Sequence, residues 1–206
     1  MAKIKYTKTE LKAQSDALKR YERFLPMLQL KKQQLQLELA TITAGIEAVS
    51  QRAAEQHEAA RAWTLLFSET ELPEDLAVLE SIETDPGNIA GVVIPIYRTV
   101  NVRRAELDLF ATPSWYDDAQ ALIETRLALA AETRVLEEQR RLIAIELTTT
   151  SQRVNLFEKI KIPECRESIR VIRIHLGDEQ TAGVVRGKMA KRRGVSIDAN
   201  DEEDVA

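Results

Sequence analysis

A seven-residue apolar repeat that begins at Leu11 constrains the fold of this chain more than any other feature. One set of repeat positions recurs every seventh residue from Leu11 to Phe67, and the other from Gln14 to Trp63. Fourteen of these 17 positions, Tyr21 included, are apolar. These positions form an apolar seam along one side of the helix. The seam is buried when the helix winds around a second helix, so the repeat predicts a left-handed coiled coil. The alternative, a helix packed on a globular core, has a wider and shorter apolar stripe.

The composition agrees with long helices. Ala, Leu, Glu, Lys and Arg supply 100 of the 206 residues, while aromatic residues make up 5%. The chain has only seven glycines and six prolines, which argues against a β-sandwich and against a glycine-rich nucleotide-binding domain. The spacing of Thr7 and Glu10 is that of a capping box, so we expect the first helix to begin there.

Helix-breaking residues divide the chain into four parts. Residues 1–67 and 114–176 hold three of the 13 Gly and Pro residues between them, whereas 68–113 holds six and 177–206 holds four. We therefore predict two coiled-coil arms, 1–67 and 114–176, around a small globular insert, 68–113, with short β-strands. The segment 177–206 is predicted to be a flexible charged tail. A helix of about 60 residues is about 90 Å long, so the arms are expected to fold back as an antiparallel pair.

The second arm and the insert carry weaker local signals. Leu122 to Phe157 keeps a spacing of seven, but further apolar residues lie off that seam, so this arm is expected to contact more than one partner. Its register is left open. In the insert, Asp85–Asn88 reads as a turn, and Val92–Tyr97 and Val100–Leu109 read as strands of a small hairpin.

No pattern in the chain indicates catalysis or a cofactor. There is no glycine-rich phosphate loop, His57 and His175 lie on opposite arms, and Cys165 is the single cysteine. No apolar run reaches membrane-spanning length, so we expect a cytoplasmic protein without direct membrane insertion. The cations from Arg186 to Arg193 are followed by acidic residues and have no interleaved aromatics, which disfavours nucleic acid binding.

The second arm also carries a recognisable motif. Thr150–Glu158, followed by Pro163 and then Ile169 and Ile172, resembles the C-terminal signature of the D subunit of V/A-type rotary ATPases. That signature typically reads Thr-Thr-x-Arg-Val-Asn-x-Leu-Glu, four residues, and Pro. Met27–Leu35 is a weaker echo of a basic motif in the first arm of the same family.

The resemblance implies a central-stalk rotor subunit without catalytic activity of its own. Its implied partners are the catalytic A and non-catalytic B subunits of a hexamer, the small F subunit, and the connector subunit of the membrane ring. It implies coupling of ATP hydrolysis or synthesis to proton or sodium transport, peripheral to the membrane. The motif positions in this sequence are Lys31, Lys32, Arg153, Asn155 and Pro163.

The sequence departs from the family pattern in its first arm, and two other classes of protein stay open. Gln29 and Gln33 replace a usual Lys and Asp, and Pro26 is expected to kink or locally unhook the first helix. A structural coiled-coil adaptor has the same heptads but does not need the spacing from Arg153 to Pro163. A nucleic-acid-binding helical hairpin needs a basic stripe along one arm, and the outward charges look mixed.

Overall fold

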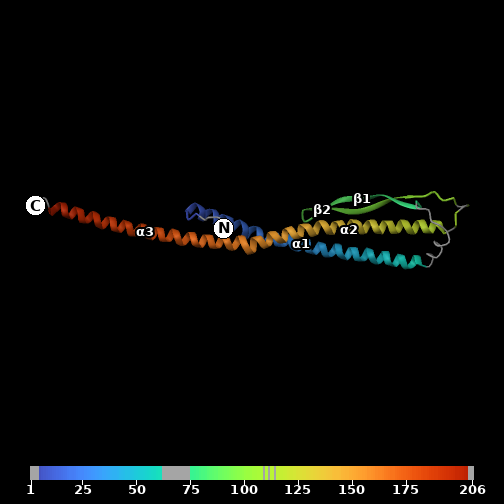
Figure 1. Ribbon diagram of the computed structural model, residues 1–206, viewed down its shortest axis with the longest axis horizontal. Helices are drawn as coiled ribbons and strands as arrows, with labels where there is room; N and C mark the ends of the chain where they lie inside the picture. Colours follow the sequence, from blue (N-terminus) through green and yellow to red (C-terminus); the bar gives the residue numbers. More distant parts are fainter. Residues whose placement is uncertain (1–4, 62–74, 109, 111, 114, 204–206) are drawn as a thin grey trace. The chain divides into compact units, whose positions relative to one another are not determined.

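The computed structural model describes residues 5–61, 75–108, 110, 112–113 and 115–203, with side chains up to Arg192. Along the chain, a β-hairpin follows the first long helical segment and precedes the second (Figure 1). The elements are α1 (Lys8–Arg61), β1 (Ala77–Ile89), β2 (Val92–Arg104), α2 (Tyr116–Leu156), the π-helical turn η2 (Phe157–Lys161) and α3 (Ile162–Glu203). The expected mainly helical fold with a small hairpin insert is confirmed.

The chain divides into two compact units, and each is described by itself. The terminal unit comprises the chain up to Gln29 together with the residues from Gln152 onward. The central unit comprises Leu30–Ser151 and contains the hairpin. Helices α1 and α2 each contribute to both units, because the last residues of α2, 152–156, belong to the terminal unit.

The residues at the heptad positions of α1 form the buried side of that helix. Every described repeat position from Leu11 to Ala60 is buried or half-buried, and Leu35, Ile42 and Val49 are almost fully buried. Burying a large aliphatic side chain completely contributes about 1.5–3 kcal/mol, so the seam supplies much of the driving force for pairing. The predicted helix start is confirmed, because Thr7 Oγ1 accepts a hydrogen bond from the Glu10 amide at 3.2 Å. The return bond of a capping box is replaced: the Thr7 amide donates to the Lys5 carbonyl, and the Glu10 carboxylate accepts from Gln14 Nε2.

In the central unit α1 and α2 run antiparallel. Lys31 contacts Glu146 and Arg52 contacts Glu132, so rising numbers on α1 meet falling numbers on α2. Ile143 of α2 is fully buried in one cluster with Leu35 and Ile42. The predicted antiparallel pairing therefore holds within this unit.

The hairpin turn lies at Ala90–Gly91, and the turn predicted at Asp85–Asn88 is wrong. Ile89 pairs with Val92, and both loop residues have positive φ, 51° and 84°. Two-residue loops of this kind match the right-handed twist of the strands they join. The Asn88 side chain does take part, because its Oδ1 accepts a hydrogen bond from the Gly91 amide at 2.9 Å.

The residues that suggested the wrong turn have other roles within β1. Pro86 lies opposite Pro95, where the two strands place two residues that have no amide hydrogen to donate. Gly87 lies beneath the Ile96 side chain, since a Cβ at Gly87 would be 2.5 Å from Ile96 Cδ1. The strands predicted at Val92–Tyr97 and Val100–Leu109 are joined in one strand, β2, which ends at Arg104 and pairs with the segment before it; Leu109 lies outside the described residues.

The hairpin is the second partner of α2, which confirms the expectation drawn from its off-seam apolar residues. Ile94 of β2 is buried in the cluster formed by Leu35, Ile42 and Ile143. Gln139 of α2 donates a hydrogen bond from Nε2 to the Pro95 carbonyl. A two-stranded hairpin is marginal alone in water, so these contacts account for its stability.

A second small hydrophobic cluster packs around the start of α2. Leu76, Tyr116 and Ala119 are buried together. The buried amide of Gln120 donates from Nε2 to the carbonyls of Leu76, at 2.8 Å, and Ala105, at 3.1 Å. One side chain therefore satisfies the backbone groups where the chain enters β1 and leaves β2.

In the terminal unit α1 pairs with η2 and α3, again antiparallel. The Tyr21 and Phe157 rings lie 5.0 Å apart between centroids, and the Tyr6 and His175 rings are stacked at 4.8 Å. The buried apolar residues of α3 recur at spacings of three and four: Ile162, Cys165, Ile169 and Ile172. That spacing is the helical counterpart of the seam on α1.

The π-helical turn explains why the sequence left the register of the second arm open. The Ile162 amide donates to the Phe157 carbonyl five residues earlier, which widens the helix just before Pro163. In a regular α-helix the proline ring would crowd the Lys159 carbonyl. From Val154 the next buried residue is Ile162, eight positions on, so the spacing of seven ends here. By contrast, α1 continues across Pro26 without ending.

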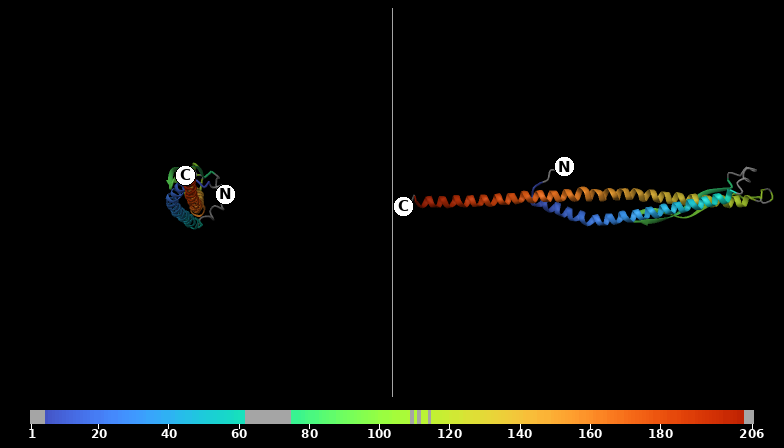
Figure 2. Two further views of the ribbon diagram at one scale, coloured as in Figure 1. Left: turned by 90° about the vertical axis from the view of Figure 1, so that its left-hand side faces the viewer. Right: turned by 90° about the horizontal axis from the view of Figure 1, so that it is seen from below.

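Helix α3 does not end near Leu176 but continues to Glu203 (Figure 2). Nothing lies within 4 Å of a Cβ built on Gly177, Gly183 or Gly187. The residues from Gly177 to Arg192 are all exposed. The flexibility predicted for 177–206 stays a prediction.

Candidate interaction surfaces

The histidines and the acidic side chains of the described residues do not form a metal site. Among them no group of three or more His, Cys, Asp or Glu side chains is placed to hold a metal ion. His57 Nδ1 lies 3.3 Å from an Arg126 guanidinium nitrogen, and His175 stacks on Tyr6. None of the described helices is long and apolar enough to cross a membrane.

Lys31 and Lys32 occupy different environments although they are neighbours. Lys31 Nζ lies 2.6 Å from Glu146 Oε1, and both side chains are about 30% exposed, at 31% and 28%. Lys32 is half-buried at a seam position of α1 and makes no ion pair with a described residue. A single cation in a seam disfavours registers that bury it fully, so Lys32 is suited to fixing the register.

Arg153 and Asn155 lie on either side of a buried residue. Val154 is only 4% exposed, whereas Arg153 and Asn155 are exposed and have no hydrogen bond or ion pair within the described chain. Successive helical residues are 100° apart, so burial of the central residue turns its neighbours outward on both sides. The Arg-Val-Asn motif thus combines one anchor with two polar side chains available to a partner.

Pro163 is exposed in the first turn of α3, directly after η2. It belongs with Arg153 and Asn155 to the terminal unit, while Lys31 and Lys32 belong to the central unit. The structure therefore places the five motif residues in two groups. Their roles in function stay predictions.

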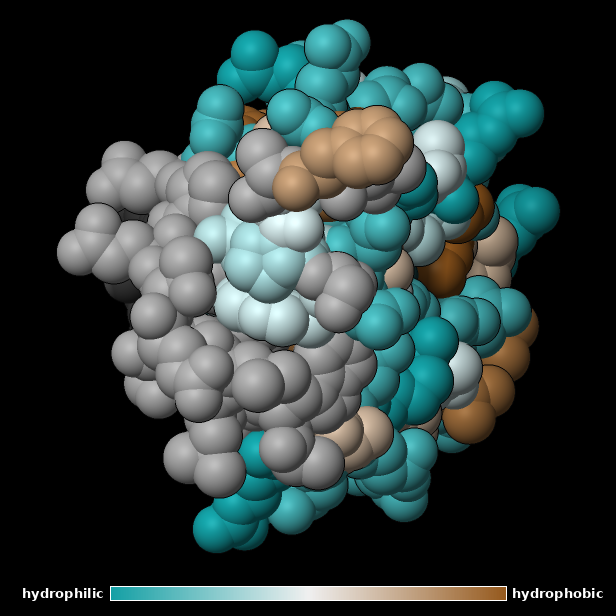
Figure 3. Space-filling model, turned by 90° about the vertical axis from the view of Figure 1, so that its right-hand side faces the viewer, coloured by the Kyte–Doolittle hydropathy of each residue, from teal (hydrophilic) through white to brown (hydrophobic). Residues whose placement is uncertain are grey.

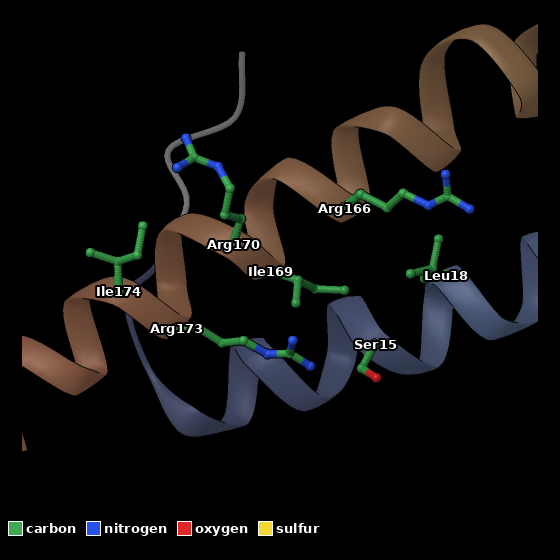
Figure 4. A pocket seen from close by; sticks show the side chains of 7 residues that line it. All are labelled: Ser15, Leu18, Arg166, Ile169, Arg170, Arg173 and Ile174. Atoms are coloured by element: carbon green, nitrogen blue, oxygen red, sulfur yellow. The ribbon is translucent and has the colours of Figure 1, made fainter.

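An open cleft of about 410 Å³ between α1 and α3 escaped the sequence analysis (Figure 4). It is lined by Ser15 and Leu18 from α1 and by Arg166, Ile169, Arg170, Arg173 and Ile174 from α3. The sequence feature that could have indicated this cleft is the spacing of the three arginines by four and three residues, which places them near one another on a helix. What lies opposite them is decided by the packing of α1.

The two units differ in charge. In the terminal unit, the residues with described side chains include sixteen Lys or Arg against eight Asp or Glu. In the central unit the described residues include eleven Lys or Arg against seventeen Asp or Glu. The net charge of −4 for the whole chain conceals this division. The two units are therefore suited to partners of different charge.

Exposed apolar side chains add a second surface feature in the central unit. Leu30, Leu37, Ile145, Val93 and Ile96 are each about half exposed or more. Figure 3 shows that the coloured part of the face it presents is mostly hydrophilic, with scattered hydrophobic residues. Exposed aliphatic side chains indicate a protein contact where they gather in one patch, whereas single ones are ordinary on a protein surface.

Cys165 has the character of a packing residue. It is buried on the seam of α3, and burial raises the pKa of its thiol, with a further rise from Glu164. A raised pKa keeps the thiol protonated and therefore unreactive.

Comparison with known proteins identifies the family. Residues 10–192 match the family model of the ATP synthase D subunit. The D subunit of the V-type ATP synthase of Borreliella burgdorferi is 41% identical over 191 residues, covering 93% of this chain and 95% of that protein. The corresponding V-type ATP synthase proteins of Chlamydia pneumoniae and Chlamydia caviae are 32% and 33% identical, each over more than nine-tenths of both chains. With a family model that spans nearly all of its described helices and relatives of matching length, this chain belongs to the ATP synthase D-subunit family.

Proposed function

We propose that this chain is the central-stalk rotor subunit of a V/A-type ATPase and transmits torque between the catalytic hexamer and the membrane sector. The observation that carries the proposal is the paired-helix construction of both units. Each unit ties α1 to the second helical arm through a buried seam and through ion pairs, such as Lys31–Glu146 and Glu22–Arg166. Interlocked helices resist twisting because rotation of one against the other would open the packed seam.

The same construction supports a non-catalytic role. A shaft needs length and torsional stiffness, and neither requires a pocket or a cofactor. ATP chemistry would then belong to the A and B subunits of the hexamer, and proton or sodium transport to the membrane sector. The chain itself would be cytoplasmic and peripheral to the membrane.

The two units are assigned to different partners. The terminal unit, with its excess of cations and its exposed Arg153 and Asn155, is suited to the hexamer. The central unit carries exposed apolar side chains, among them Leu37, Val93 and Ile96, which are suited to the small F subunit and the connector. These assignments follow the order expected for the family.

The experiment is purification of the chain through an affinity tag from its own cells, followed by observation of a particle attached to it. A rotor brings down ATPase catalytic subunits and a small partner, and turns in one direction when ATP is added to the immobilised complex. A structural adaptor, the second candidate, would also copurify with partners because the same heptads suit it. It would not rotate, and an ATP-independent, static attachment would reject the rotor proposal.

A further inference from the structure

We propose that Pro86 prevents a second copy of this chain from pairing its own β1 with the outer edge of β1. The outer edge comprises the backbone groups of Thr84, Pro86 and Asn88 that point away from β2. An exposed strand edge is a template for pairing with another chain, and a proline on the edge blocks that pairing. The property belongs to the free chain, so it does not depend on the proposed function.

The direction of the backbone groups at Pro86 follows from its place relative to the hairpin turn. Ile89 and Val92 flank the two-residue loop Ala90–Gly91, so they form a hydrogen-bonded pair. Along an antiparallel ladder, hydrogen-bonded and non-hydrogen-bonded pairs alternate. Pro86 and Pro95 are the third pair beyond Ile89 and Val92, so they form a non-hydrogen-bonded pair. The nitrogen and the carbonyl oxygen of each proline therefore point away from the other strand.

A contact of Gln139 agrees with this direction and shows that the two edges of the hairpin differ. Gln139 Nε2 on α2 donates to the Pro95 carbonyl, so the edge of β2 faces α2 at this position. The edge of β1 has no such cover. Within the described residues the sheet has two strands, and Thr84, Pro86 and Asn88 are all exposed. Of the two prolines, only Pro86 therefore lies on an edge that is open to another chain.

Pro86 lies in the middle of the regular part of β1. Two register shifts interrupt the ladder before Thr84, so regular pairing with β2 runs from Thr84 to Ile89. Every second residue of this stretch directs its backbone groups to the outer edge, and Pro86 is the central one of the three. Proline has no N–H, and its ring occupies the space in which the hydrogen would lie. An added strand would therefore lose its central hydrogen bond.

Two identical edges that pair around a two-fold axis would meet this defect twice. In the antiparallel arrangement centred on Pro86, the two prolines lie opposite each other, and Thr84 of one copy lies opposite Asn88 of the other. Both donors are then missing at the centre of the contact. In every other antiparallel register that includes this position, each copy still lacks one donor. A carbonyl that is buried without a donor costs free energy, so the pairing is disfavoured.

The test compares the self-association of the full-length wild type, Pro86→Thr and Pro95→Thr by sedimentation velocity over a range of concentrations. Pro86→Thr supplies an N–H on the outer edge, and a β-branched residue suits a strand. Pro95→Thr is the matched control, because it lies directly opposite and its new N–H faces α2. We expect Pro86→Thr to lower the Kd of the dimer about tenfold, since two hydrogen bonds per dimer are restored. Pro95→Thr should leave it within about twofold of wild type.

A second variant moves the proline along the same edge. The double change Thr84→Pro with Pro86→Thr keeps the composition and transfers the missing donor to the neighbouring outward position, so it should return self-association to the wild-type level. Hydrogen exchange locates the contact, because the peptide that contains residues 84–88 of Pro86→Thr should become protected as the concentration rises. Unchanged melting temperatures of all variants, by circular dichroism, would show that the fold is intact.

Self-association through other surfaces is common to all of these proteins, so the comparison between them isolates the outer edge. If Pro86→Thr associates no more strongly than Pro95→Thr, the proline is not what keeps the edge unpaired, and the proposal is overturned. It is also overturned if the stronger association persists after the proline is moved to position 84, or if protection arises outside β1. None of these results bears on the rotor, which is tested by copurification and rotation.

Discussion

Lys31 Nζ lies 2.6 Å from Glu146 Oε1, and this contact joins α1 to α2 across 115 positions of the chain. Arg52 and Glu132 form a second ion pair at 2.9 Å in the same unit. Pairs of this kind contribute little free energy when they are exposed, but they penalise any shift of one helix along the other. Together with the apolar seam they hold α1 and α2 in one register.

A double-mutant cycle at Lys31 and Glu146 should show a coupling free energy of about 0.5–1 kcal/mol, since both side chains are partly shielded from water. Urea denaturation of Lys31→Met, Glu146→Gln and the double variant measures it. Arg98 and Asp85 are the control, because they are 3.6 Å apart and more than half exposed. A coupling no larger than that of the control would mean that the pair does not contribute to holding the register.

The change Gly→Ala should have opposite effects at two positions. Gly45 is inside α1, and a Cβ there would lie 3.9 Å from Leu136 Cδ1, an ordinary contact. Gly45→Ala should therefore stabilise the chain by about 0.5–1 kcal/mol. Gly91 has φ of +84°, so Gly91→Ala should destabilise it by about 1 kcal/mol or more. Thermal unfolding of both variants tests this, and effects of the same sign would contradict the turn at Ala90–Gly91.

Val154→Ala should lower the free energy of unfolding by about 2 kcal/mol, because Val154 is buried. Arg153→Ala and Asn155→Ala should change it by less than about 0.5 kcal/mol, because both side chains are exposed. If these two residues contact the hexamer, their variants will instead lower ATP-driven rotation or coupled turnover. Melting curves and rotation rates of the same three variants separate the two effects. Loss of stability with intact coupling in Arg153→Ala would show a structural role.

Cys165 should react slowly with disulfide reagents in the native protein. Burial raises the pKa of its thiol above the ordinary value, and the thiolate is the reactive form. The stability that this thiol contributes is fully present below its unfolded pKa of about 8.5 and falls as pH rises toward the folded pKa. Because the chain has one cysteine, absorbance from a thiol reagent reports this site alone. Equal rates in native protein and in denaturant would contradict the buried position.

Glu138 and Glu167 should titrate below the ordinary range of glutamate. The hydrogen bonds from Arg141 lower the pKa of Glu138, and those from Arg170 lower the pKa of Glu167. The stabilisation from a lowered pKa is present above the unfolded value of about 4.3 and is lost as pH falls through the folded value. Arg141→Gln should return only Glu138 to the ordinary range, as measured by NMR of the side-chain carboxyl carbons. A shift of Glu167 in that variant would indicate coupling that the structure does not show.

Helical pairing could be predicted from the sequence because its cause is local and periodic. Leu35, Ile42 and Val49 recur at a spacing that places them on one side of any α-helix, and that side must be buried whatever covers it. Thr7 and Glu10 mark the helix start for a similar reason, since a cap is made within four residues. The Thr150–Pro163 motif belongs to the same class of signal, because it is written in adjacent residues.

The tertiary structure decided the features that depend on contacts between distant residues. Asp85–Asn88 has the composition of a turn, but pairing with β2 and the side chain of Ile96 over Gly87 hold it as strand. The wide turn before Pro163 shifts the buried side of the second arm by one residue. The spacing of Arg166, Arg170 and Arg173 places them within about two turns of one helix. Only the packing of α1 gave them Glu22, Ser15 and Leu18 as neighbours, because a counter-charge more than 140 residues away has no signature in local sequence.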